Sequence, residues 1–124
     1  MVGRTYQHAN REVLLEGGPL PAGVEDVRAA FAPAGQLRPL PEDVIVTAAD
    51  AGGVPAYWLD VPGADTERVL LYLHGGGYTL GSLRSHGPLA AHLGRAAGRR
   101  VLFPEYRLAP EHRFPAAVDD VLTA

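Results

Sequence analysis

Two reactive residue types are missing from this sequence. There is no cysteine among the 124 residues, which excludes disulfides, thiolate metal ligands and a cysteine nucleophile. There is no lysine either, because all eleven basic residues are arginine, so Schiff-base chemistry and a phosphate-loop lysine are excluded. Serine occurs only as Ser82 and Ser85. The sequence therefore offers few side chains for covalent catalysis.

Long apolar runs and clustered positive charge are also lacking. No segment approaches the ~20 apolar residues that span a bilayer, and the N-terminus has no apolar core typical of a signal peptide. The formal net charge is -3 and the arginines are scattered along the chain. A basic face for nucleic acid is therefore not expected. We expect a cytoplasmic protein with no membrane span and no nucleic-acid partner.

The composition, with 47% hydrophobic and 20% charged residues, is typical of a globular domain or part of one. Residues 1–41 contain weak helical signals among turn residues. Val24, Val27 and Phe31 share one face of a short helix that Pro33 should end. We expect this region to be a lid or covering segment, or an ordinary extension packed on the surface.

From residue 42 onward the sequence alternates between strand and helix patterns. The expected strands are 43–50, 54–61, 68–74 and 99–106, and the expected helices are 85–98 and 114–124. The first two strands should form an antiparallel hairpin through a glycine-containing loop. The run at 68–74 is apolar without alternation, which is typical of a strand buried on both faces. The order β, β, β, α, β, α predicts an α/β fold with the last two strands parallel.

The helix at 85–98 is predicted by Leu89, Leu93 and Ala97, which lie four residues apart. Ser85 or Gly87 could serve as its N-cap, and Gly98 lies at its C-terminal end.

The third strand runs directly into His74 and three glycines. A dinucleotide-binding loop would need a glycine at position 80, which is Leu80, while Gly81 comes one residue too late. A phosphate loop is excluded because no Gly-Lys-Ser/Thr follows. Two interpretations remain. The glycines form a tight exit from the strand that needs positive φ, or they leave backbone N–H groups free to bind a developing oxyanion.

Two blocks of the sequence resemble a known family. They are "HGGGYTLGS" with "SH" at 85–86, and "PEYRLAPEHRFPAAVDD" at 104–120. Both resemble the hormone-sensitive-lipase-like α/β hydrolases, the bacterial esterases of family IV. The resemblance covers residues 42–124, and it implies the N-terminal part of an α/β-hydrolase domain with residues 1–41 as a helical cap.

The resemblance implies roles for the glycine block. Gly76 and Gly77 would supply the amides of the oxyanion hole, and Gly75 would supply the turn. His74 would orient the loop rather than act as a base. Tyr78 would line the acyl or alcohol pocket, or pack beneath the cap.

The second block would be a supporting loop. Arg107 and Glu111 are suitable for an ion pair that holds it. The remaining histidines, His86, His92 and His112, have no spacing that suggests a shared metal. We therefore expect no metal and no cofactor.

The nucleophile, acid and base of such an enzyme are not found in these residues. Neither Ser82 nor Ser85 lies in a G-x-S-x-G elbow. A pairing of Ser85 with His86 is not expected, because adjacent side chains at a helix start point in different directions.

We therefore expect the N-terminal portion of a serine carboxylesterase, which would act on small or short-acyl esters through an acyl-enzyme. The strand at 68–74 would then be an apolar edge, prone to self-association or to pairing with a missing C-terminal portion. The alternative is a non-catalytic α/β fragment that acts through a partner chain or has no activity of its own.

Overall fold

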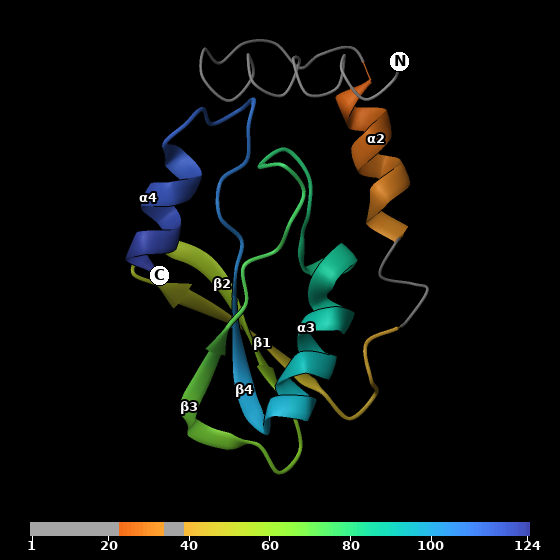
Figure 1. Cartoon of the computed structure of the whole chain (residues 1–124), viewed down its shortest axis with the longest axis vertical. Helices are drawn as coiled ribbons and strands as arrows, with labels where there is room; N and C mark the ends of the chain where they lie inside the picture. Colours follow the sequence, from red (N-terminus) through yellow and green to blue (C-terminus); the bar gives the residue numbers. More distant parts are fainter. Residues whose placement is uncertain (1–22, 34–38) are drawn as a thin grey trace.

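The computed structural model describes residues 23–33 and 39–124 (Figure 1). Predictions for residues 1–22 and 34–38, which make up most of the expected covering segment, lie outside the described residues. The elements run in the order α2 (Val24–Phe31), β1 (Ile45–Ala51), β2 (Val54–Asp60), β3 (Asp65–Leu71), α3 (Leu83–Ala97), β4 (Arg99–Pro104) and α4 (Ala116–Thr123). The predicted order of strands and helices is confirmed, as is the short helix before them.

The strands form one mixed sheet in the order β1-β2-β4-β3. β1 and β2 are antiparallel, and the register joins Ala51 to Val54 across the turn. Gly52 and Gly53 make that turn with φ angles of 67° and 94°, which suits a two-residue hairpin. β4 is antiparallel to β2 and parallel to β3. Both predicted pairings, the hairpin and the parallel pair, are confirmed.

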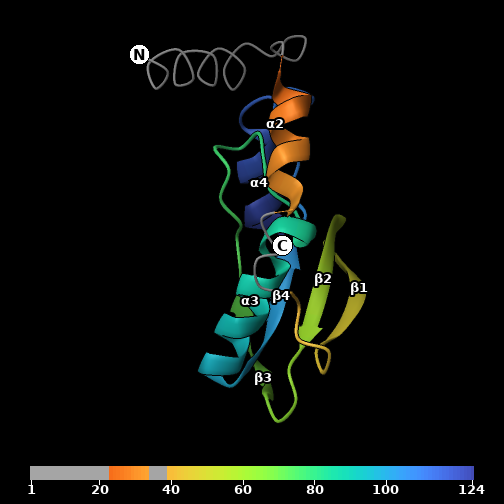
Figure 2. The same cartoon turned by 90° about the vertical axis from the view of Figure 1, so that its right-hand side faces the viewer.

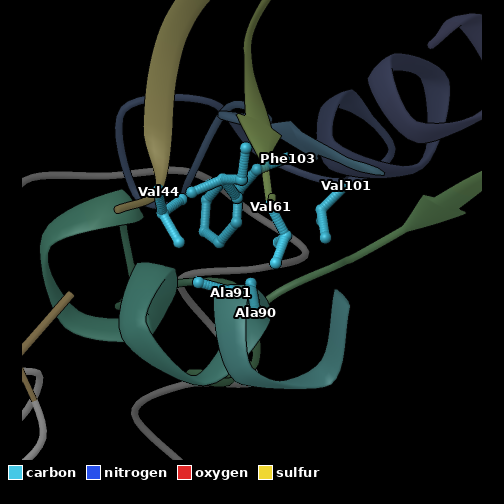
Figure 3. Packing of buried hydrophobic residues seen from close by; sticks show 7 residues of the cluster. Val44, Val61, Ala90, Ala91, Val101 and Phe103 are labelled. Atoms are coloured by element: carbon cyan, nitrogen blue, oxygen red, sulfur yellow. The ribbon is translucent and has the colours of Figure 1, made fainter. Parts of the chain in front are cut away.

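The core lies between α3 and the sheet (Figure 3). It is formed by small residues of the helix and larger residues of the strands and their flanks: Val44, Leu59, Val61, Ala90, Ala91, Val101 and Phe103. Helix and sheet approach closely at Gly94, where a Cβ would lie 2.5 Å from Cγ2 of Val101. Small side chains on the helix therefore set the distance between the two layers.

The leucines that predicted α3 do not face this core. Leu89 and Leu93 are 52% and 43% exposed, whereas Ala90, Ala91 and Gly94 are buried. The periodicity indicated the helix correctly, but its inward face is the one with small residues because only these allow the close packing. The predicted cap was also wrong, because the helix begins after Ser82.

The start of α3 is held from two directions. The hydroxyl of Ser85 accepts a hydrogen bond from the amide of Ser82 at 3.0 Å. The carboxylate of Glu105 accepts one from the amide of Leu83 at 2.6 Å. Glu105 follows β4, so its carboxylate satisfies a free helix N–H and ties the helix start to the end of that strand.

α4 begins after Pro115, as predicted from a proline near its first position. Figure 2 shows α4 and α2 near the same end of the molecule, away from the turn that precedes β3. α3 is the longest helix described, with 15 residues. None of the described helices has the length and apolar character needed to cross a bilayer.

β3 forms an edge of the described sheet. Within that sheet it pairs only with β4, and alternate residues of the strand and its extension, Val69, Leu71 and Leu73, are 46%, 44% and 43% exposed. The expected burial on both faces is therefore wrong for the described residues, because no second layer of the described chain covers these side chains. The predicted apolar edge is confirmed there.

Candidate active site

The glycine block forms a tight loop beyond the end of β3. Gly76, Gly77 and Tyr78 all have positive φ angles, of 131°, 61° and 61°. The carbonyl of Gly76 accepts hydrogen bonds from the amides of Thr79 and Leu80 at 3.2 and 3.0 Å, which closes the turn. A Cβ on Gly76 would lie 2.3 Å from the Leu80 carbonyl oxygen, so the turn needs glycine there. We call residues 74–80 the glycine loop.

Four consecutive amides of this loop, those of residues 75–78, donate no hydrogen bond among the described residues, and Gly76 and Gly77 are the central pair. Among the hydrogen bonds of the described residues, none uses the N–H of Gly76 or Gly77. Both glycines line a pocket of about 390 Å³. Successive free N–H groups beside a left-handed residue are a common way for a backbone to bind an anion.

The pocket is bounded by the glycine loop on one side and by α4 on another. Its lining consists of Leu73, His74, Gly75, Gly76, Gly77, Tyr78, Tyr106, Ala117, Val118, Val121 and Leu122. The α4 residues are all apolar, so this part of the lining suits a hydrocarbon group. Tyr78 is half-exposed and lines this pocket.

His74 is buried and held in place by Tyr106. The Tyr106 hydroxyl donates to the His74 carbonyl, and the two rings stack with centroids 4.3 Å apart. Nδ1 of His74 lies 2.9 Å from the Gly75 carbonyl oxygen. Because a carbonyl only accepts, Nδ1 carries the proton in this contact. The opposite nitrogen, Nε2, is buried and has no partner among the described residues.

Burial changes the acid–base behaviour of both rings. It lowers the pKa of His74 below the usual value, and the hydrogen bond to Gly75 opposes this only in part. Burial also raises the pKa of Tyr106 to about 12. Both side chains are therefore uncharged near neutral pH. A neutral histidine bonded to its own loop suits an orienting role better than that of a general base.

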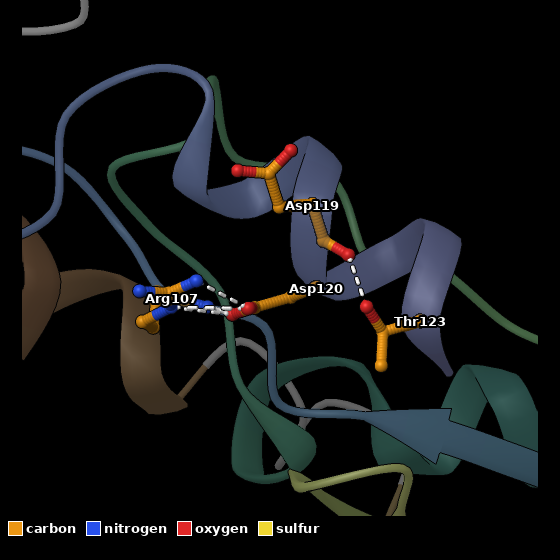
Figure 4. A network of polar contacts seen from close by, with 4 residues as sticks. All are labelled: Arg107, Asp119, Asp120 and Thr123. Atoms are coloured by element: carbon orange, nitrogen blue, oxygen red, sulfur yellow. Dashed lines mark hydrogen bonds and ion pairs between the residues drawn. The ribbon is translucent and has the colours of Figure 1, made fainter.

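The loop after β4 is attached to α4 by an ion pair (Figure 4). Nη2 of Arg107 lies 2.7 Å from Oδ1 of Asp120, and the Arg107 amide donates to Oδ2 at 2.8 Å. The side chain of Asp120 is only 11% exposed. Hydrogen bonds from Arg107 hold the pKa of Asp120 below its usual range.

The predicted pairing of Arg107 with Glu111 is wrong. Glu111 pairs instead with Arg28 of α2, with 2.6 Å between Nη1 and Oε1. Residues 105–115 form no helix, so a spacing of four does not bring the two side chains together. Each finds an opposite charge on a different helix.

Ser85 and His86 are closer than predicted. The Ser85 hydroxyl lies 3.0 Å from Nδ1 of His86, but it also lies 3.1 Å from the Ser82 carbonyl oxygen. Its single proton can serve only one of these acceptors. The hydroxyl also accepts the N–H of Ser82 at the start of α3, so it acts as a helix-capping group.

His86 lies among the rings of Phe31, Tyr72 and His74. Its ring centroid is 5.6 Å from Phe31 of α2 and 5.5 Å from His74. Burial lowers the pKa of His86, and His74 adds to the effect. Within residues 23–33 and 39–124, no three histidine, aspartate or glutamate side chains are grouped as metal ligands.

Sequence reasoning missed three residues that support the loop. They are Arg28, Tyr106 and Gly81. A Cβ on Gly81 would lie 2.1 Å from Nδ1 of His74, so this glycine makes room for the histidine ring. Tyr106 and Gly81 lie inside the two quoted blocks and could have been singled out there. Arg28 had no local signal, because its partners are 51 and more residues away.

Known proteins are similar to parts of this chain. A family model described as alpha/beta hydrolase fold matches residues 70–124. An acetyl-hydrolase of Streptomyces hygroscopicus is 47% identical over 90 residues, which cover 73% of this chain and 28% of the relative. An ethyl acetate hydrolase of Pseudomonas putida is 58% identical over 55 residues, which cover 44% of this chain and 17% of the relative.

Solved structures agree over nearly the whole chain. An esterase from the bacterial hormone-sensitive lipase family matches with a TM-score of 0.78 and 39% identity, covering 99% of this chain and 40% of its own. A hormone-sensitive lipase from a metagenome library matches with a TM-score of 0.74 and 35% identity, covering 100% of this chain and 41% of its own. The chain thus spans less than half the length of either structure. The fold is part of the α/β-hydrolase fold, and the chain belongs to the hormone-sensitive-lipase-like family, where it corresponds to an N-terminal portion.

Proposed function

We propose that this chain supplies the oxyanion hole of a serine carboxylesterase. The observation that carries the proposal is the pair of free amides at Gly76 and Gly77, side by side on the wall of a pocket. In ester hydrolysis a serine hydroxyl attacks the ester carbonyl carbon, and the carbonyl oxygen becomes an oxyanion. Two preorganised N–H groups stabilise this charge without rearranging during the reaction.

The neighbouring residues have supporting roles in this proposal. The turn is made at Gly76 and Gly77 rather than at Gly75 as predicted, because Gly75 has no positive φ and nothing lies within 4 Å of its Cβ position. The His74 ring holds the Gly75 carbonyl at 2.9 Å. Tyr78 and the α4 residues border the space for the substrate. The nucleophile, acid and base come from outside these 124 residues, which contain no G-x-S-x-G sequence.

The substrate class in this proposal is small or short-acyl esters. The apolar α4 wall faces a pocket of about 390 Å³, which suits a short hydrocarbon group. Two relatives have names that refer to acetyl and ethyl acetate hydrolysis, which supports the same size of substrate. We also propose that residues 1–41 cover the site, since α2 already contacts the glycine loop through Arg28.

The test uses the complete gene product and p-nitrophenyl acetate. We expect hydrolysis, and we expect a fluorophosphonate to label a serine other than Ser82 and Ser85. A Gly76→Ala variant should lose roughly 10²–10³ in kcat, because its Cβ would displace the turn that presents the amides. Gly63→Ala is the matched control, since Gly63 also has a positive φ, 74°, but nothing lies within 4 Å of its Cβ position.

Two results would contradict the proposal. One is labelling of Ser82 or Ser85 with loss of activity when that serine is replaced. The other is an active Gly76→Ala variant with kcat close to that of Gly63→Ala.

A second candidate function is pairing with another polypeptide, without catalysis. The observation that favours it is the edge of β3, where Val69, Leu71 and Leu73 are all more than two-fifths exposed. An exposed apolar edge can add a strand from another chain. A gene product that is inert toward esters and sediments as a defined oligomer would favour this function over the esterase.

A further inference from the structure

One side chain of α2 reaches three groups around the glycine loop. Nε of Arg28 donates to the Thr79 carbonyl at 2.7 Å, and Nη2 donates to the Ala109 carbonyl at 2.9 Å. The two terminal nitrogens also contact both carboxylate oxygens of Glu111, at 2.6 and 3.0 Å. A single guanidinium therefore connects α2, the glycine loop and the loop after β4.

One carbonyl that Arg28 contacts belongs to the glycine loop, and the other belongs to the loop after β4, which is bonded to the glycine loop. Thr79 donates its amide to the carbonyl of Gly76 and so closes the turn. Ala109 donates its amide to the carbonyl of Tyr78, which has a left-handed φ of 61°. A non-glycine residue in this conformation persists only where its surroundings hold it. Arg28 holds the residue that follows Tyr78 and also the loop to which Tyr78 is bonded.

The chemistry of this position requires arginine. The Arg28 side chain is 28% exposed, so most of its contacts are with protein rather than water. Glu111 supplies the opposite charge, and its hydrogen bond raises the pKa of Arg28 above the usual value. A planar guanidinium can donate hydrogen bonds to two carbonyls and a carboxylate at once, whereas a lysine ammonium lacks this planar arrangement of donors. The Phe31 ring beside His86 gives α2 a second contact in the same region.

We propose that Arg28 is a positioning residue that holds the glycine loop in the conformation in which the Gly76 and Gly77 amides are free. The catalytic part of this inference depends on the proposed esterase function. The structural part does not. α2 is then an element of the active site as well as a cover.

The experiment compares Arg28→Met and Arg28→Lys with Arg95→Met in the complete gene product. Arg95 is the matched control because it also forms a 2.6 Å ion pair, with Asp43, but makes no described contact with the glycine loop. Hydrogen exchange is measured at the amides of Thr79, Leu80 and Ala109, which are bonded inside the two loops. The kcat and KM for p-nitrophenyl acetate are measured in parallel.

We expect both Arg28 variants to exchange these amides at least about tenfold faster than Arg95→Met, because the loops open more often. We expect kcat to fall by roughly ten- to a hundredfold with KM changed much less, since misplaced amides weaken binding to the transition state. The lysine variant should not restore kcat. An Arg28 effect equal to that of Arg95→Met on exchange would overturn the inference.

Faster exchange with unchanged kcat would also overturn the positioning role. A gene product with no esterase activity would count against the proposed function instead, and exchange alone would then decide whether Arg28 holds the loop.

Discussion

Replacing Gly81 with alanine tests how tightly the site is built around His74. Gly81 has a φ of 105°, and an added Cβ would lie 2.1 Å from Nδ1 of His74 and 2.5 Å from the Gly75 carbonyl oxygen. The His74 ring cannot easily move aside, because it stacks on Tyr106 at 4.3 Å and on Phe103 at 5.7 Å. The new methyl group must therefore displace the ring, the glycine loop or both.

The hairpin provides a matched control for this substitution. Gly53 has a φ of 94°, close to that of Gly81, but nothing lies within 4 Å of its Cβ position. Alanine at either site carries a conformational cost of about 1–3 kcal/mol for the positive φ. Only Gly81→Ala adds an overpacking cost, which is roughly 1–3 kcal/mol in well-packed surroundings. The difference between the two variants isolates the contact with His74.

Urea unfolding of both variants in the complete gene product measures this difference. We expect Gly81→Ala to be less stable than Gly53→Ala by roughly 1–3 kcal/mol, with a midpoint lower by about 1 M if m is about 1–2 kcal/mol/M. Esterase activity should fall only in Gly81→Ala. Equal stability of the two variants, within about 0.5 kcal/mol, would refute the view that Gly81 is needed to make room for His74.

Acid should destabilise the folded protein through His74, which is buried, and His86, which is partly buried. Burial lowers the pKa of His74 and of His86 in the folded protein. As the pH falls through the ordinary histidine pKa of about 6.5, the unfolded chain therefore binds protons before the folded protein does. The free energy of unfolding then falls. The loss should reach at most about 1.4 kcal/mol per pH unit for each histidine, and urea unfolding of His86→Phe at several pH values should show a shallower dependence. Asp120→Asn should lower the Tm by roughly 5 °C, because it removes the charge that bonds Arg107. Asp119→Asn is its control and should have little effect, since no described hydrogen bond uses the Asp119 carboxylate. Calorimetry of the two asparagine variants checks this, and equal Tm values would contradict it.

The order of elements could be predicted because it depends on short-range patterns. Local backbone preference is indicated by three short patterns: the apolar run before His74, the glycines between the first two strands, and the proline before α4. The parallel pairing of β3 and β4 followed from the helix between them, since a crossover of that kind connects parallel strands. The roles of Gly76 and Gly77 remain predictions, now supported by their free amides.

Predictions failed where packing between distant segments was decisive. Leu89 and Leu93 have the correct spacing for a buried face, yet the helix turns Ala90, Ala91 and Gly94 inward because small residues let it approach the sheet. Burial of β3 on both faces is predicted from an apolar run without alternation. Such a run does not say which layers cover the strand.

The family, the order of the elements and the place of the glycine loop after β3 follow from the sequence, because each depends on residues close together in the chain. Which distant side chains form polar contacts depends on the folded structure. Arg28 and Glu111 are 83 residues apart, and Tyr106 and His74 are 32 apart. Such partners are chosen by the packing of whole elements, since a local pattern carries no information on which distant segment will lie beside it.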